Sequence, residues 1–283
     1  MAVRTDLALE MHEKIGSTSG VHYEQRNEEG LGVHEIVIRT PEAAKRYQRP
    51  CGRYITVHVP NLSYLDESVG GLSDCLLRQM ERFDFPRENI VVAGIGNRHI
   101  TPDALGPAVA DRIFATRHLN PNTLAMIGIQ KVHTVSCILP GVIGQTGIET
   151  LESIQSVIAT VKARGLIVVD AFAAAELSHL GNTVQFCDSG LSPGSGVGNN
   201  RKNISPETCG VPVLCIGIPT CVEAAAFCES VGEGSDEEKR AASMIVTPKE
   251  IDLLILHASM LLSGVINRFL QPELDPELLN GLV

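Results

Sequence analysis

The sequence contains no tryptophan, and aromatic residues make up only 4% of its 283 residues. A core without large rings must be built from Val, Ile, Leu and Ala, and a hydrophobic content of 44% is sufficient for one. Aliphatic cores of this kind are typical of a buried parallel sheet covered by helices. No apolar run reaches the roughly 18 residues that a membrane-spanning helix needs, so we expect no membrane partner.

The chain also has fewer positive than negative side chains, with 23 Lys and Arg against 33 Asp and Glu and a formal net charge of −10. This balance argues against a protein that binds nucleic acid by neutralising phosphates, although it leaves room for a local basic groove. None of the eight cysteines forms a C-x-x-C pair, and the N-terminus has no apolar signal-peptide segment. We therefore expect a reducing, cytoplasmic location without disulfides.

Strand-like and helix-like patterns alternate along most of the chain. Residues 1–30 are polar and without strong periodicity, and we expect them to be exposed and partly mobile. The alternation predicts a three-layer α/β fold with a mostly parallel sheet and helices on both faces. Strands are predicted at 32–39, 53–59, 90–95, 132–139, 166–170, 183–187 and 211–218, and helices at 70–83, 103–118, 148–161, 171–177 and from Thr247-Pro248 to Leu270.

A glycine pair follows the strand at 90–95, in the sequence GIGNRHITPDALGP at 94–107. Gly94 and Gly96 would let the backbone approach a ligand closely, so both are candidate substrate-binding residues. The segment is not a dinucleotide fingerprint, because His99 stands where a third glycine is required. Asp103 follows Pro102 at an expected helix start, where it either serves chemistry or only complements the helix dipole.

Asp170 ends the most strand-like run of the sequence, LIVVD at 166–170. Ligands of open α/β sheets bind beyond the carboxyl ends of the strands, so Asp170 and Asp103 are expected at the same edge. Two carboxylates held close together cannot both ionise easily, and their pKa values separate. One carboxylate could then act as a base on water and the other as an acid; the alternative is that Asp170 merely caps the next helix.

A glycine-rich loop at 188–202 contains the sequence PGSGVGNNRK at 193–202. Its backbone N–H groups could face an anion or a developing oxyanion, and Arg201 and Lys202 would favour an acidic substrate side chain. The alternative is a flexible surface loop. No G-x-S-x-G or H-E-x-x-H motif is present, and Glu176-x-x-His179 is an isolated pair that gives only a weak metal signal.

Several of these stretches together resemble the germination protease family of spore-forming bacteria. The stretches run from the first residues to the C-terminal helix and are specific only in combination. They are VRTDLA at 3–8, TPDALGP at 101–107, PGV at 140–142, GIET at 147–150, PGSGVGN at 193–199, IGIPT at 216–220 and MIVTPKE at 244–250.

The resemblance implies an endopeptidase that degrades small acid-soluble spore proteins during germination, with a fold similar to hydrogenase maturation peptidases. It also implies a self-processing zymogen, a homotetramer and a location in the forespore or spore core. Two aspartates act in the family, and by motif they fall on Asp103 and Asp170. Its substrates are cut after an acidic residue and before a large apolar residue and Ala, with Glu two positions further on.

The segment DLALE at 6–10 repeats that substrate pattern. We therefore predict self-cleavage between Asp6 and Leu7, which divides the chain into a propeptide of residues 1–6, here called the leader, and a single α/β peptidase domain of residues 7–283. Better-known members of the family are longer between the strand near Ile218 and the last helix, a segment that here shrinks to 221–242.

No metal or other cofactor is predicted, although hydrogenase-processing peptidases bind a metal through acidic residues and a His. The glycine-rich loop contains no His that could serve in this way, since Ser192 precedes Pro193. Two alternatives stay open at this point. One is a metal-dependent peptidase on the same scaffold, and the other is a non-catalytic module that binds spore proteins or an anion.

Overall fold

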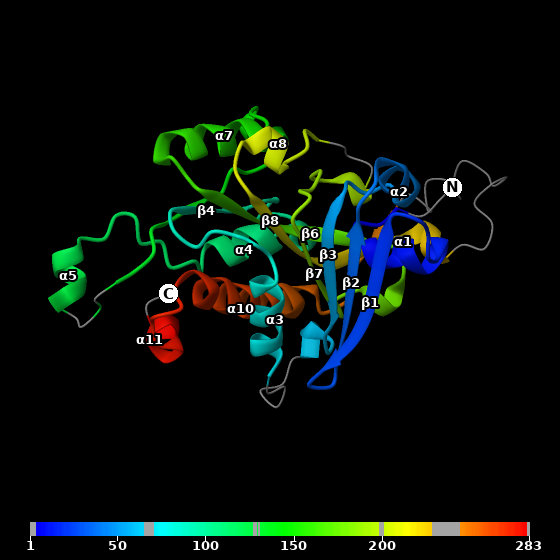
Figure 1. Cartoon of the computed structure of the whole chain (residues 1–283), viewed down its shortest axis with the longest axis horizontal. Helices are drawn as coiled ribbons and strands as arrows, with labels where there is room; N and C mark the ends of the chain where they lie inside the picture. Colours follow the sequence, from blue (N-terminus) through cyan, green and yellow to red (C-terminus); the bar gives the residue numbers. More distant parts are fainter. Residues whose placement is uncertain are drawn as a thin grey trace.

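The structure is a computed structural model that describes residues 4–64, 71–126, 129, 131–197, 201–227 and 244–281. Its strands form one sheet in the order β1-β2-β3-β7-β8-β6-β4-β5, and β9 pairs with β8 (Figure 1). The strands are β1 (Val21–Glu28), β2 (Leu31–Ile38), β3 (Gly52–His58), β4 (Ile90–Gly94), β5 (Val135–Ile138), β6 (Gly165–Ala174), β7 (Thr183–Cys187), β8 (Val213–Glu223) and β9 (Ile245–Val246).

The sheet is mixed, so the expectation of a mostly parallel sheet is wrong. Only the pairings among β5, β4, β6 and β8 are parallel, three of the eight pairings between the described strands. The other half is antiparallel, and only its first pair, β1 and β2, is joined by a short turn. Between β1 and β2, Glu29 and Gly30 both have positive φ, as a two-residue turn that matches the strand twist requires.

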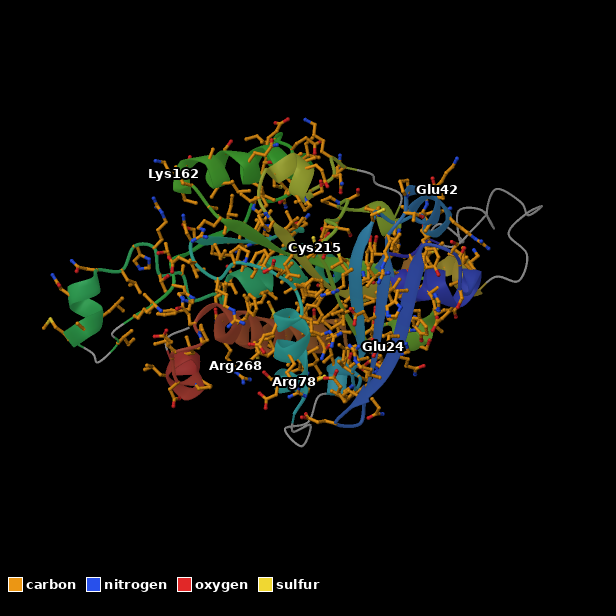
Figure 2. The ribbon with its side chains drawn as sticks, viewed as in Figure 1. Glu24, Glu42, Arg78, Lys162, Cys215 and Arg268 are labelled. Atoms are coloured by element: carbon orange, nitrogen blue, oxygen red, sulfur yellow. The ribbon has the colours of Figure 1, made fainter. Side chains whose placement is uncertain are left out.

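Helices cover both faces of the sheet, which gives the three layers that the alternation predicted. Along β6, Ile167 and Val169 belong to one buried cluster and Leu166 and Val168 to the other, because successive side chains of a strand point to opposite faces. In Figure 1, α7 and α8 lie over one face and α3, α4 and α10 over the other. Figure 2 shows Cys215 of β8 in the middle of the molecule, whereas Glu42 and Lys162 lie at its edges.

The helices vary from single turns to twenty residues. They are α1 (Ala8–Ile15), α2 (Pro41–Tyr47), α3 (Leu72–Glu81), α4 (Leu105–Ala110), α5 (Pro121–Met126), α6 (Ile143–Thr146), α7 (Thr150–Val161), α8 (Pro206–Cys209), α10 (Ile251–Leu270) and α11 (Pro276–Gly281). Short 3₁₀ turns are η1 (Leu62–Tyr64), η2 (Thr101–Asp103), η3 (Leu177–His179), η4 (Ser195–Val197) and η5 (Ala224–Phe227).

Helix α10 is long and apolar enough to cross a membrane, yet 61% of its apolar window is buried inside the protein. It packs against α3, α4 and η1, and Arg268 near its end pairs with Asp74 of α3 at 2.7 Å. Its apolar composition is therefore that of a core helix. The seven cysteines in the described part of the chain are free thiols.

Three helix predictions are wrong because tertiary partners override local propensity. Residues 171–174 continue β6, since β8 pairs beside them as far as Ala174 and Val222. The helix expected over 103–118 ends at Ala110, and Asn267 of α10 binds both the Arg112 carbonyl and the Phe114 N–H at 2.9 Å. Thr247 does not cap α10, because β9 keeps the chain extended and the helix begins at Ile251.

The N-terminal segment also differs from the expectation of an exposed, partly mobile stretch. Leu7 and Ala8 are fully buried, and residues 21–28 form the edge strand β1. Helix α1 packs its apolar face into the cluster on the α2 side of the sheet. The sequence pattern of the segment did not predict this burial, because the burial depends on contacts with distant strands.

We predict that Leu262→Ala lowers the free energy of unfolding by about 2–5 kcal/mol, because Leu262 of α10 is fully buried in the core. Met260→Ala on the same helix is the matched control, since its side chain is 56% exposed and should cost under about 0.5 kcal/mol. Urea unfolding followed by circular dichroism measures both. Equal effects of the two substitutions would contradict the assignment of α10 as a core helix.

Candidate active site

Asp103 is held by the loop that follows β4. The Asn97 N–H donates to Asp103 Oδ2 at 2.8 Å, and the Thr220 hydroxyl of β8 donates to the Pro102 carbonyl at 2.6 Å. Gly96 has φ +123°, and a Cβ there would lie 2.0 Å from the Asp103 carbonyl oxygen. Only glycine therefore permits the close turn that aims Asp103 at the sheet.

Asp170 lies within β6, where it pairs with Gly217 of β8, and it does not end the strand. Its carboxylate is 5% exposed, and Oδ1 accepts the N–H of Ala171 at 2.9 Å. Burial, and then the negative charges of Asp103 and Asp6, raise the pKa of Asp170 well above its ordinary value. Burial also raises the pKa of Asp103, although the Asn97 N–H opposes this effect.

Asp103 and Asp170 line one cavity of about 630 Å³, and Asp6 lines it too. The two aspartates that sequence reasoning placed at one sheet edge are therefore brought together. The third carboxylate was not expected there. Asp6 is half-buried, and desolvation of its carboxylate raises its pKa against the lowering effect of its hydrogen bonds.

Asp6 binds the edge of β6 at a bend just before helix α1. Strand β4 pairs with β6 only as far as Val169, and beyond that point Asp6 N–H donates to the Ala173 carbonyl at 2.8 Å. The Ala173 N–H donates back to Asp6 Oδ2 at 2.9 Å. The register of β6 with β8 shifts between Phe172 and Ala173, a bulge of the kind that re-aims backbone groups beside binding sites.

Three further side chains hold the residues around Asp6. Ser195 donates its hydroxyl to Asp6 Oδ1 at 2.7 Å, and Arg49 donates to the Thr5 carbonyl. Gln185 of β7 donates to the Asp6 carbonyl at 3.0 Å and accepts the Ala8 N–H at 2.8 Å. Because the Gln185 oxygen must face the Ala8 N–H, its amide nitrogen faces the carbonyl of the Asp6-Leu7 peptide bond.

The other predicted site residues fall in different places. Gly96 and Arg201 line the cavity. Gly94 lies beneath it, where a Cβ would come 2.2 Å from the Gly106 carbonyl oxygen, so it serves the packing of α4 on β4. Lys202 pairs with Glu152 of α7 at 2.7 Å on the surface and is not among the described residues that line the cavity.

Sequence reasoning missed Ser195, Gln185, Arg49 and Ala173 as individual residues. Ser195 lies in the glycine-rich loop that was expected to face an anion, so that loop carried a signal. No local pattern marked Arg49 or Gln185, because their roles depend on the antiparallel half of the sheet lying beside β6 and β8. Among the described residues, no group of three or more His, Cys, Asp or Glu is arranged to hold a metal ion.

The fold and the cavity define an α/β protein that holds part of its own N-terminal segment, at Asp6, beside a carboxylate pair. The family model described as "Germination protease" matches residues 2–232. A germination protease of Caldanaerobacter subterraneus is 35% identical, with 100% of this chain and 98% of the relative covered. One of Clostridium perfringens is 33% identical, with 98% of each chain covered. The chain belongs to the germination protease family and is an endopeptidase.

Two further comparisons add detail. The alignment with the Caldanaerobacter subterraneus protein extends over 321 positions, so that relative carries residues that these 283 lack. Most of the segment at 221–242, where we predicted the shortening, lies outside the described residues. The [NiFe] hydrogenase maturation protease HycI of Thermococcus kodakarensis matches with a TM-score of 0.37 and 22% identity, over 65% of this chain and 92% of that one.

We predict that Asp170→Asn stabilises the protein near pH 7 and that the gain vanishes near pH 4. A carboxyl with a raised pKa binds its proton more tightly in the folded chain than in the unfolded one. The free energy of unfolding therefore falls as pH rises from the ordinary value of 3.8 to the raised pKa, by up to about 1.4 kcal/mol per pH unit. Above that pKa the loss stays constant.

Urea unfolding of wild type and variant across this pH range measures the difference. The exposed Asp84→Asn substitution controls for the loss of one negative charge. A difference between wild type and Asp170→Asn that does not change with pH would contradict the buried, proton-holding state of Asp170.

Proposed function

We propose that this chain is a self-processing zymogen that initiates the degradation of small acid-soluble spore proteins, and that it cuts after an acidic residue. One observation supports this above the others. Asp6, which begins the segment that repeats the family's substrate pattern, lines the same cavity as Asp103 and Asp170. The leader would thus be bound as a substrate is bound.

The carboxylate pair would supply acid–base hydrolysis by water. Asp170 has the more strongly raised pKa and would hold the proton that the leaving amine needs. Asp103 is more exposed and would be the base that activates water. Gln185 donates to the carbonyl oxygen of Asp6 and would stabilise the negative charge that develops there during attack.

The preference for an acidic residue before the cut would come from the partners of the Asp6 side chain. Ser195 and the Ala173 N–H bind its two oxygens. Desolvation raises the pKa of Asp6, and the Arg49 charge opposes this rise. A Cβ at Gly196 would lie 2.1 Å from Asp6 Oδ2, so glycine leaves the room that this carboxylate occupies. Arg201 lines the same cavity and is a second source of positive charge.

The assembly and location proposed here rest on the family resemblance alone. They are a homotetramer in the cytoplasm of the forespore and the spore core. Light scattering of the purified zymogen and of the processed protein tests the tetramer.

We predict that purified wild-type protein loses residues 1–6 and cuts a small acid-soluble spore protein after acidic residues. Asp103→Asn and Asp170→Asn should each slow both reactions by about 10²–10⁴-fold, the usual contribution of general acid–base catalysis. Intact-mass spectrometry of the chain and of the fragments measures both. Loss of a different N-terminal segment would contradict the assignment of Asp6-Leu7 as the processing site.

Two further measurements, inhibition by a chelator and binding of the spore protein, distinguish the carboxylate-pair protease from the metal-dependent peptidase and the non-catalytic module. Inhibition by a chelator that is reversed by added metal would favour a metal-dependent peptidase on this scaffold. Binding of the spore protein without any cleavage, also after the leader is removed, would favour the non-catalytic module. Full activity of both Asn variants would overturn the carboxylate pair and leave the family unchanged.

We also predict that Ser195→Ala slows leader removal by roughly 10- to 100-fold, because a hydrogen bond to a charged group is worth about 1.5–3 kcal/mol. Ser192→Ala in the same loop is the matched control, since Ser192 bonds Asn203 at 3.4 Å and does not bond Asp6. The time course of mass loss gives both rates. Equal rates for the two variants would show that Ser195 does not recognise the acidic side chain.

A further inference from the structure

Two buried cysteines face each other across the antiparallel strands β7 and β8. Cys187 ends β7, and the register places it directly opposite Cys215 of β8. Directly opposed residues of antiparallel strands point to the same face, and their Cα atoms lie about 4.5 or 5.5 Å apart. Both values fall within the Cα separation of about 4.4–6.8 Å that a disulfide needs. The backbone therefore already holds these two thiols where a bond could join them.

The thiol pair lies beside a row of side chains that belongs to the candidate active site. Two positions along the strands, Gln185 of β7 is opposite Gly217 of β8, and Gly217 is paired with Asp170 of β6. Because alternate residues of a strand share a face, the two thiols lie on the same face of the sheet as Gln185 and Asp170. A bond between the thiols would thus form one row away from two side chains of the site.

The two thiols differ in their access to small molecules. Cys187 lines a second cavity, of about 180 Å³, together with Asp6, Asp170 and Gln185. This space is sufficient for a few waters or one peroxide molecule. Cys215 is fully buried and is not among the described residues that line the cavity, and burial, followed by the Cys187 thiol, raises its pKa well above the ordinary value. Cys187 is thus the thiol that an oxidant meets first, and Cys215 is placed to react second.

The Cys187 thiol also contacts the loop that holds the Asp6 side chain. Its S–H donates to the Gly190 carbonyl at 3.6 Å, at the start of the glycine-rich loop. The same loop carries Ser195, whose hydroxyl donates to Asp6 Oδ1 at 2.7 Å. A disulfide sulfur has no hydrogen, so oxidation of Cys187 would remove one donor that fastens this loop to β7.

We propose that Cys187 and Cys215 are a modification site, at which a peroxide converts the two thiols into a reversible disulfide that slows removal of the leader. The slower removal rests on the function proposed above, whereas the formation of the disulfide does not. Disulfides of cytosolic proteins are usually transient and catalytic or redox-sensing, and a pair of free thiols beside the site fits that use.

The chemistry proceeds in two steps. Hydrogen peroxide oxidises the Cys187 thiol to a sulfenic acid, and its O–O bond breaks as one water is released. The Cys215 sulfur then attacks the Cys187 sulfur, and the sulfenic hydroxyl leaves with the Cys215 proton as a second water. Two thiols and one peroxide thus give one disulfide and two waters. The buried Cys215 thiol can react because it is held beside its partner, at a high effective concentration.

The test treats the purified full chain with hydrogen peroxide and follows it by mass spectrometry. The wild type should lose the mass of two hydrogens, and digestion without reductant should yield the peptides of Cys187 and Cys215 joined to each other. Leader removal should slow by about 2- to 10-fold, the range expected for the loss of one neutral hydrogen bond. Dithiothreitol should restore both the mass and the rate.

Three variants accompany the wild type. Cys215→Ala removes the thiol that reacts second, so Cys187 should stop at the sulfenic acid, which dimedone traps as an adduct. The double variant Cys187→Ala/Cys215→Ala should process its leader at one rate with and without peroxide. Cys75→Ala is the matched control, because Cys75 is fully buried in the cluster on the other face and should not affect the disulfide or the slowing. Circular dichroism identifies any variant that fails to fold, and the reversal of the wild-type effect by dithiothreitol then decides.

The outcomes separate this inference from the proposed function. A wild type that forms no disulfide, or that joins either thiol to Cys209 instead, overturns the modification site. A disulfide that leaves the rate of leader removal unchanged, or a slowing that persists in the double variant, overturns its effect on processing. A reduced wild type that does not remove its leader contradicts the proposed function, whereas the mass of the joined peptides still decides whether Cys187 and Cys215 form the disulfide.

Discussion

The open edge of β6 beyond Val169 is the constraint on which the site depends. Strand β4 leaves β6 at this point, and the Ala173 N–H and carbonyl need other partners, because buried backbone polar groups without hydrogen bonds are costly. Asp6 supplies both. An unpaired sheet edge of this kind is also a template that binds an extended peptide through its main chain. The edge that must be covered for stability is thus the edge suited to receive a substrate.

Three carboxylates around one cavity, of which Asp170 is buried and Asp6 and Asp103 are half-buried, add an electrostatic cost to this arrangement. Asp103 and Asp6 both raise the pKa of Asp170, beyond the effect of burial. Full ionisation of all three groups is therefore unfavourable, and the pKa of Asp170 is raised most strongly because it is buried and faces both other carboxylates. Departure of Asp6 removes one of these charges and eases the ionisation of its neighbours. Leader binding and the protonation of the carboxylate pair are therefore linked.

Sequence alone predicted the family from the combination of its motifs. It also placed Asp103 and Asp170 at one sheet edge, because the strands before them carry strong local patterns. The prediction that the strand at 166–170 ends at Asp170 was wrong, because β6 continues to Ala174. The residues at 171–174, mostly alanine, have low intrinsic strand propensity, and they are extended because β8 pairs with them. The expectation of a mostly parallel sheet was wrong for a related reason. The antiparallel strands come from the N-terminal segment and β7, whose patterns do not encode the direction in which they pair.

The buried N-terminal segment was beyond sequence reasoning for a different physical reason. DLALE matches a substrate pattern, yet its burial depends on Gln185, Ser195 and His179, which are about 180 residues away in the chain. Glu176-x-x-His179 was noted only as a weak metal pair. In the structure, the Glu176 backbone and the His179 ring bind Glu10, so the spacing of the two side chains carried no information.

The same contacts that would recognise a substrate would also keep the zymogen inactive. A segment tethered to the enzyme meets its site at a high effective concentration, which a separate substrate must exceed. Cleavage between Asp6 and Leu7 would free residues 1–6 from that tether, so that Asp6 could leave as a product. Leu7 to Glu10 would remain tethered and would still compete for the same groups. Processing would then lower the barrier to substrate binding in part.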